Sequence, residues 1–495
     1  MDPLVVLDSV SVRNGIKLLV REVSLSIRPE ESWAIVGGNG AGKTVLTEAI
    51  AGLRKISGGS IDYPGLRVPE REIQVVSFEA QRRIIEAERK RDESNLLQGA
   101  ADPGTTVRRF LETAAGSLDD HTALLRRFAL EEVLDRGLKF LSTGEIRKTL
   151  LCRALLPEPR LLILDDPFDG LDIASREELS GLIEHLAEGN HALLVVLGRR
   201  GEIPPGVDRV VLMEGGKALY VGETTGIPAS FGEASPPSEV PLPAGPSEGT
   251  SGLGEPGPDG PGPLIRMDGV SVSYGEKRVF REITWEAHPG EVWHIIGPNG
   301  SGKTTLLSLI DGSNPKAYGR RFWLFGRLRG SGESVWEIKA RIGHVSADFH
   351  RSYPPRTTAL NTILSGFSDT AGLYEEPSGL HIDTARQWLT VLNLADQEST
   401  PLGRLSYGQQ RSLLVARAMV KMPPILIADE PTQGLDDEHS ELVLSVLERI
   451  GTETEALVLY VSHDPTQRLR CTTHRMFLEP DPAGSRARVE AVAGR

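Results

Sequence analysis

The chain has 495 residues, of which 39% are hydrophobic and 25% are charged, and its formal net charge is −13. Its longest apolar runs, such as Ala192–Leu197, are far too short to span a bilayer, and its acidic balance argues against broad nonspecific attachment to nucleic acid. Cys152 and Cys471 offer neither a disulfide framework nor metal-ligand spacing, so we expect a protein of the reducing cytoplasm, or one peripheral to the inner face of the cytoplasmic membrane.

The first half begins with residues 1–12, which lack the regions of a signal peptide and predict a strand. An apolar run at 32–36 then leads into a segment that matches G-x-x-x-x-G-K-[ST] and precedes a helix-like stretch, the context that a phosphate-binding loop requires. The loop residues are Gly37, Gly38, Asn39, Gly40, Ala41, Gly42, Lys43 and Thr44. Backbone N–H groups would surround phosphate oxygens, Lys43 would reach the β- and γ-phosphates, and Thr44 would hold Mg²⁺.

The same loop occurs again in the second half, after an apolar run at 291–296. Its residues are Gly297, Pro298, Asn299, Gly300, Ser301, Gly302, Lys303 and Thr304, with Thr305 next. An offset of 260 places Lys43 on Lys303, and an offset of 264 places Asp165 on Asp429. The chain is therefore a duplication with two predicted nucleotide sites.

Composition predicts the domain boundaries. We place the domains at 1–225 and 263–480, a linker at 226–262 and a C-terminal tail at 481–495. The linker is rich in Pro, Gly and Ser and is acidic, without one Lys or Arg, which predicts a flexible tether. Basic residues between Arg82 and Arg91 alternate with acidic ones, which favours a solvated helix over a nucleic-acid patch, although both interpretations stay open.

Short apolar runs alternate with helical patterns in each half. The runs at 161–164, 425–428 and 457–462 end directly before Asp165, Asp429 and His463. This pattern predicts an α/β fold with a mixed, mostly parallel sheet and flanking helices, and it places functional groups at the carboxyl ends of the strands. Segments 81–139 and 353–403 have few strand signals and predict mainly helical insertions.

A second pair of motifs, Leu-Ser-Thr-Gly-Glu at 141–145 and Leu-Ser-Tyr-Gly-Gln at 405–409, precedes the strands that end in acidic pairs. Each motif alone would indicate only a serine cap on a surface helix. Together with the loops, they resemble the signature motifs of ATP-binding cassette (ABC) ATPases, and the order of motifs is similar to that family in both halves. The signature residues are Ser142, Gly144, Glu145, Ser406, Gly408 and Gln409.

The resemblance implies two P-loop NTPase domains of the ABC type in tandem, each with a helical subdomain, that use ATP and Mg²⁺. It also implies that the halves pair head to tail, so that each signature meets the ATP bound by the other half. In the second half, Glu430 would polarise the attacking water, His463 would contact the γ-phosphate and Tyr274 would stack on adenine. The resemblance assigns Thr44, Asp165, Thr304 and Asp429 to Mg²⁺, and Asp172 and Asp436 to the D-loops.

The first half departs from this pattern at three positions. Asp166 stands where Glu430 stands, Arg199 where His463 stands and Asn14 where Tyr274 stands. A shorter carboxylate misplaces a water-orienting group, and about 1 Å of misplacement can cost on the order of 10²-fold in rate. We therefore expect one hydrolytic site and one that mainly binds ATP, while a first site that turns over through Asp166 and Arg199 remains an alternative.

The biological role stays open. In transporter ATPases a Gln after the strand that follows the loop couples to the permease, but here the positions read Val345-Ser346-Ala347 and Val76-Ser77-Phe78-Glu79, and Gln81 is displaced. Segments 140–152, 164–172, 324–333 and 406–411 resemble a subgroup of tandem ABC ATPases associated with molybdenum transport genes, although Asp166 departs from the Glu more usual there. One interpretation is a peripheral ATPase with a separately encoded permease. The others are a permease-free ATPase acting on nucleic acid or protein, and a low-turnover clamp.

Overall fold

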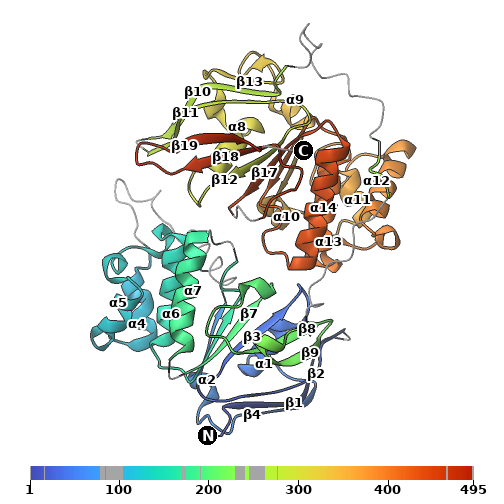
Figure 1. Ribbon diagram of the computed structural model, residues 1–495. Coiled ribbons are helices and arrows are strands. Elements are labelled where there is room, and N and C mark those ends of the chain that lie inside the picture. Colours follow the sequence, from blue (N-terminus) through green and yellow to red (C-terminus); the bar gives the residue numbers. More distant parts are fainter. Residues whose placement is uncertain are drawn as a thin grey trace. The chain divides into compact units, whose positions relative to one another are not determined.

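The computed structural model describes residues 2–15, 17–77, 84, 88, 104–169, 171, 173–189, 191–228, 240–244, 262–275, 277–463 and 467–492. They form two compact units, Met1–Glu233 and Ala234–Arg495. In each unit, helices flank a mixed, mostly parallel sheet, and a smaller antiparallel sheet lies beside it (Figure 1). The predicted α/β fold in two tandem units is confirmed.

The main sheet of unit 1 has the strand order β5-β6-β7-β3-β8-β9. All neighbours are parallel except β8 and β9, which pair antiparallel. Because the parallel strands end at one edge, the phosphate-binding loop after β3 and the acidic pair after β6 share that edge. The strands are β3 (Ser32–Gly37), β5 (Ile73–Ser77), β6 (Leu161–Asp165), β7 (Ala192–Leu197), β8 (Arg209–Glu214) and β9 (Lys217–Glu223).

Strand alternation divides the core of unit 1 into two layers. Trp33 and Ile35 of β3 pack with the small sheet and helix α1, whereas Ala34 and Val36 face the other helices. Since successive side chains of a strand point to opposite faces, a fully apolar strand such as β3 can supply both cores. The small sheet consists of β1 (Val5–Asn14), β2 (Lys17–Ile27) and β4 (Gly58–Asp62).

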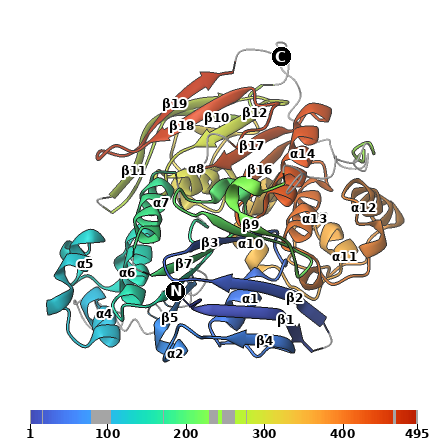
Figure 2. The same cartoon turned by 60° about the horizontal axis from the view of Figure 1, so that its bottom comes forward.

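Some helices of unit 1 form a subdomain that is inserted between β5 and β6. Helix α4 packs against α6, and α5 lies near them in both views (Figures 1 and 2). The helical insertion predicted at 81–139 is confirmed for 104–139; its earlier part lies outside the described residues except for 84 and 88. The helices are α1 (Lys43–Ile50), α2 (Pro69–Glu72), α4 (Val107–Ala115), α5 (Thr122–Arg127), α6 (Thr143–Leu155) and α7 (Ile173–Ala187).

Unit 2 repeats this plan. Its main sheet has the order β15-β16-β17-β12-β18-β19, with parallel neighbours except for the antiparallel pair β18 and β19. Its strands are β12 (Val292–Ile296), β15 (Ile342–Ser346), β16 (Ile425–Asp429), β17 (Leu457–Ser462), β18 (His474–Glu479) and β19 (Arg486–Ala491). The small sheet contains β10 (Ile265–Tyr274), β11 (Lys277–Ala287), β13 (Phe322–Leu324) and β14 (Arg327–Leu328).

The helical subdomain of unit 2 packs around the fully buried Trp388 of α12. Helix α13 contacts both α11 and α14, so the signature helix is held from two sides. The helices predicted at 353–403 are present. The helices of unit 2 are α8 (Lys303–Ile310), α9 (Val335–Ala340), α10 (Ala347–Ser352), α11 (Ala359–Leu364), α12 (Gly379–Val391), α13 (Tyr407–Met419) and α14 (Asp437–Glu453).

Two segments differ from the predicted boundaries. Residues 481–495 were expected to form a tail, but Arg486–Ala491 forms β19 and extends the main sheet beside β18. Residues 226–262 were expected to form a flexible tether, but 240–244 lies on unit 2. There Arg449 donates a hydrogen bond to the backbone carbonyl of Val240 at 2.6 Å, and Leu242 packs against the core. Composition revealed neither contact, because both depend on partners far away in the sequence.

The two cysteines are free thiols. Cys152 and Cys471 are both buried and form no disulfide with each other. Burial raises the pKa of the Cys152 thiol to about 12, so it is protonated at neutral pH. None of the described helices is long and apolar enough to cross a membrane.

Candidate functional site

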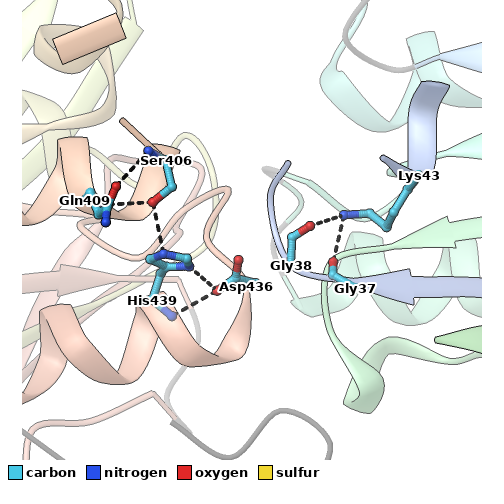
Figure 3. A network of polar contacts seen from close by, with 7 residues as sticks. All are labelled: Gly37, Gly38, Lys43, Ser406, Gln409, Asp436 and His439. Carbon is cyan, nitrogen blue, oxygen red and sulfur yellow. Dashed lines mark hydrogen bonds and ion pairs between the residues drawn. The ribbon is translucent and has the colours of Figure 1, made fainter. Parts of the chain in front are cut away.

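The phosphate-binding loop of unit 1 has the backbone that its glycines allow. Gly40 and Gly42 have φ values of 81° and 95°, in the left-handed region that glycine tolerates best. A Cβ atom on Gly42 would also lie 2.6 Å from the carbonyl oxygen of Leu19. The buried Lys43 donates hydrogen bonds to the carbonyls of Gly37 at 2.7 Å and Gly38 at 3.1 Å (Figure 3). The ammonium group is thus held over the loop, where a bound phosphate would meet it.

The loop of unit 2 repeats this geometry. Gly300 and Gly302 have φ values of 82° and 99°. Lys303 donates to the carbonyls of Gly297 at 2.6 Å and Pro298 at 3.2 Å. Each lysine begins the helix that follows its loop, α1 or α8, so the N-terminal N–H groups of that helix face the loop.

A pocket of about 910 Å³ opens over the loop of unit 2. Predicted residues line it, including Tyr274, Asn299, Lys303, Thr304, Asp429 and Glu430. The pocket walls also contain Arg278, Arg351 and the turn 480–485, which sequence analysis did not single out. The Pro-Asp-Pro-Ala-Gly sequence at 480–484 is typical of a turn between two strands, whereas the predicted tail begins at 481.

Of the expected Mg²⁺ ligands, the aspartates end strands β6 and β16, and the threonines lie in the first turns of helices α1 and α8. In unit 1, the Thr44 hydroxyl donates a hydrogen bond to Oδ1 of Asp165 at 3.3 Å. In unit 2, Thr304 and Asp429 line the same pocket. Hydroxyl and carboxylate oxygens beside a phosphate-binding loop fit Mg²⁺, which takes few protein ligands and completes its shell with phosphate and water.

Glu430 and His463 meet at the ends of the neighbouring strands β16 and β17. Nδ1 of His463 lies 3.3 Å from Oε1 of Glu430, and both side chains are largely buried. Desolvation by burial would raise the pKa of Glu430, but the hydrogen bond with His463 and the nearby His463 and Lys303 outweigh it and lower that pKa. Glu430 is therefore an ionised carboxylate at neutral pH, as a water-polarising group must be.

Asp166 occupies the matching position in unit 1 with the same backbone. Its φ is 50° against 46° for Glu430, and both backbone N–H groups donate across to the neighbouring strand, to Val196 at 3.1 Å and Val461 at 3.0 Å. Surrounding protein atoms displace water and raise the pKa of Asp166 to about 7; Lys43 opposes this shift and nearby carboxylates add to it. The side chain keeps an exposed surface, where solvent screens these charges. Arg199 follows β7 where His463 follows β17.

Both signature motifs are capped helix starts. Ser142 caps α6 and Ser406 caps α13, and each forms a capping box with the residue three positions later, Glu145 or Gln409. Gly144 and Gly408 lie in the first turns of these helices. The first-turn geometry leaves N–H groups at each helix start, which suits an anion.

The structure describes only some of the positions that match the coupling Gln of transporter ATPases, after β15 and β5, and only one of the two D-loop aspartates. Ser346 caps α10, accepting a hydrogen bond from the backbone N–H of Phe349 at 3.1 Å, and it lines the pocket together with Ala347. In unit 1, Ser77 ends β5, while residues 78–83, including Glu79 and Gln81, lie outside the described residues. Asp436 caps α14. Asp172 also lies outside the described residues.

Tyr274 is held at the pocket by a contact that the sequence did not reveal. Its hydroxyl accepts a hydrogen bond from Nδ2 of Asn314 at 2.8 Å, and the Lys316 ammonium lies 5.8 Å from the centre of its ring. Tyr274 is 47% exposed and lines the pocket, so it is accessible to a base that enters there. Asn14 at the matching position of unit 1 offers no such ring.

We expect Tyr274→Ala to raise the apparent KM for ATP about tenfold, because stacking of a base on an aromatic ring contributes roughly 1–3 kcal/mol. Tyr274→Phe is the matched control, since it keeps the ring and loses only the hydrogen bond with Asn314. Its KM should stay close to that of the parent protein. Equal KM values for the Ala and Phe variants would show that the ring does not stack on the base.

Comparisons with known proteins identify the family of the chain. The ABC transporter family matches residues 20–169 and 280–433. The chain is 38% identical over 473 residues to the ABC transporter ATP-binding protein ModF of Escherichia coli (strain K12), covering 92% of this chain and 93% of that protein. It is 29% identical to an uncharacterized ABC transporter ATP-binding protein of Schizosaccharomyces pombe, covering 93% and 95% of the two chains.

Solved structures share the fold. An archaeal ribosome recycling factor, aABCE1, solved with the ribosomal stalk protein aP1, superposes with a TM-score of 0.58 at 20% identity, covering 97% of this chain and 89% of that one. The structure of an RNase-L inhibitor gives a TM-score of 0.59 at the same identity and covers 97% and 90% of the two chains. With both halves matched by one family, the chain belongs to the ABC transporter family as a member with two ATP-binding units in tandem.

Proposed function

We propose that this protein is an ATPase with two composite sites, in which each signature motif binds the γ-phosphate of the ATP held by the other unit. The support within each unit is complementary: a loop that can hold phosphate, and a capped helix start that can bind an anion. The pairing itself is inferred from the family.

The site built on the loop of unit 2 is the hydrolytic one in this proposal. Glu430 orients and polarises the attacking water, while Lys303 stabilises the charge on the phosphate oxygens. His463 orients Glu430 through their contact and meets the γ-phosphate. Mg²⁺ bound by Thr304 and Asp429 would neutralise charge on the phosphates.

The site on the loop of unit 1 mainly binds ATP. Asp166 is one methylene shorter than Glu430, and Arg199 stands where His463 stands, so Asp166 lacks both the reach and the imidazole that would place it against the attacking water. Arg199 carries a permanent positive charge that can hold phosphate. The residence time of ATP at this site would therefore exceed the time that the other site needs for one catalytic cycle.

The observation that carries the proposal is the contrast between the Glu430–His463 pair and Asp166 with Arg199. It is tested by loading the protein with ATP and Mg²⁺, removing free nucleotide, and measuring what stays bound. About one ATP per chain should remain, and ADP should be released. Retention of ADP at both sites, or of no nucleotide, would contradict an asymmetric pair.

For the biological role, we propose that this ATPase energises or regulates a transport system through a separately encoded permease. The support is the name of the ModF relative, a transporter ATP-binding protein, and the subgroup resemblance points to a molybdate-related cargo. A second candidate is a permease-free ATPase that acts on nucleic acid or protein, or a clamp with little turnover. Ser346 and Ala347 favour it, since they line the pocket where the coupling Gln of transporter ATPases would stand.

Co-purification separates the two roles. The Glu430→Gln variant should be isolated from its native cells with ATP and Mg²⁺ present, because slow hydrolysis favours the closed, partner-bound state. Recovery of a polytopic membrane protein would support transport. Recovery of nucleic acid or of soluble protein alone would favour the second candidate. The Lys303→Ala variant, which should bind ATP poorly at the hydrolytic site, is the matched control.

A further inference from the structure

The signature serine of unit 2 is part of a polar network that includes His439, and the residue that matches His439 in unit 1 is Ser175. Oγ of Ser406 lies 3.0 Å from Nε2 of His439, and Nδ1 of His439 lies 2.7 Å from Oδ1 of Asp436 (Figure 3). The same carboxylate oxygen accepts the backbone N–H of His439 at 2.9 Å. The network joins the start of α13 to the start of α14, and so joins the signature to the D-loop.

His439 also packs directly on the signature glycine. A Cβ atom built on Gly408 would lie 1.9 Å from Cδ2 of His439, so the imidazole fills the space beside the first turn of α13. In unit 1 the matching residues are Gly144 and Ser175. Among the described residues, no atom lies within 4 Å of a Cβ built on Gly144. The signature glycine of unit 2 is therefore packed against an imidazole, whereas that of unit 1 has open space beside it among the described residues.

The proton positions follow from the partners. The Asp436 carboxylate can only accept hydrogen bonds, so Nδ1 of His439 is the donor; at pH 8.5, two units above the ordinary pKa of histidine of about 6.5, Nε2 carries no proton and is an acceptor. A serine hydroxyl has one proton. Ser406 therefore donates that proton to His439, while its oxygen accepts the backbone N–H of Gln409 at 3.2 Å. In this arrangement the hydroxyl has no proton left for a phosphate oxygen.

We propose that His439 is a positioning residue that withholds the Ser406 hydroxyl from ATP, and that the hydroxyl becomes available when the D-loop draws Asp436 and His439 away from it. This inference rests on the proposed function, in which Ser406 meets the γ-phosphate of ATP bound at Lys43. It assigns His439 to control over how tightly the non-hydrolytic site holds ATP. In unit 1 the matching residue, Ser175, has no imidazole, so the control acts on one site.

The test is the half-time for loss of radiolabelled ATP from the loaded full-length protein at pH 8.5, after free nucleotide is removed. His439→Ser reproduces the residue of unit 1. His439→Phe keeps a ring beside Gly408 but removes both ring nitrogens. Both variants should lengthen the half-time about tenfold or more, the factor expected for one hydrogen bond to a charged group. A merely structural role for His439 predicts no lengthening with Phe and a shorter half-time with Ser.

Ser406→Ala distinguishes failure of this inference from failure of the proposed function. Alone, it should change the half-time less than about twofold, because His439 already withholds the hydroxyl; combined with His439→Phe, it should remove the gain that His439→Phe gives, because the two residues act through one hydroxyl. If Ser406→Ala shortens the half-time but neither His439 variant lengthens it, the role of His439 is wrong and the composite site stands. If Ser406→Ala and both His439 variants all leave the half-time unchanged, both are wrong.

Discussion

Glu430→Gln is expected to lower steady-state ATP hydrolysis by about 10²- to 10⁴-fold, the range for removal of a general base. The amide keeps the size of the side chain and its place beside His463, but it cannot take a proton from water. The P-loop and the Tyr274 contact are untouched, so ATP should still bind. The change is measured as phosphate release at saturating ATP, with ATP binding measured separately on the same preparation.

Asp166→Asn is the matched control for this variant. Asp166 has the same backbone position in unit 1, so the control removes a carboxylate at the equivalent place. Because we assign little hydrolysis to that site, Asp166→Asn should change the steady-state rate less than about twofold. This is well below the tenfold change that about 1.4 kcal/mol would cause. Equal losses in the two variants would mean that both sites hydrolyse ATP.

The nucleotide loops could be predicted residue by residue from the sequence because their chemistry is local. Gly42 and Gly302 have the left-handed backbone that their motif requires, and Lys43 and Lys303 lie over the loops as expected. The capping boxes at Ser142 and Ser406 are local for the same reason, since cap and partner are three residues apart. Short-range sequence patterns were therefore sufficient to predict the loop backbone, the loop lysines and the capped helix starts.

Contacts between distant segments could not be predicted. The Asn314 amide reaches Tyr274, and His439 reaches Ser406, only after helices and sheets have packed. Strand β19 was missed because Arg486–Ala491 has mixed polarity, and it becomes a strand by pairing with the edge of the main sheet at β18. Such edge strands need not be apolar, since only part of their side chains is buried.

The pair Asp166→Glu and Arg199→His is expected to restore hydrolysis to the Glu430→Gln protein. The backbone at 166 already matches that at 430, with φ of 50° and 46° and the same hydrogen bond to the neighbouring strand. A longer carboxylate there would reach the water position, and an imidazole at 199 could orient it as His463 orients Glu430. Phosphate release should rise about 10²-fold over Glu430→Gln alone.

Each single substitution separates the two contributions. Asp166→Glu alone lengthens the carboxylate but leaves Arg199 without an imidazole beside it, and Arg199→His alone supplies an imidazole to a carboxylate that is too short. Because the two groups act as a unit, we expect each to recover much less than the pair. If the pair recovers nothing, then side-chain identity at these positions does not account for the asymmetry. The cause would then lie in what faces the loop of unit 1, where the proposed function places the Ser406 signature.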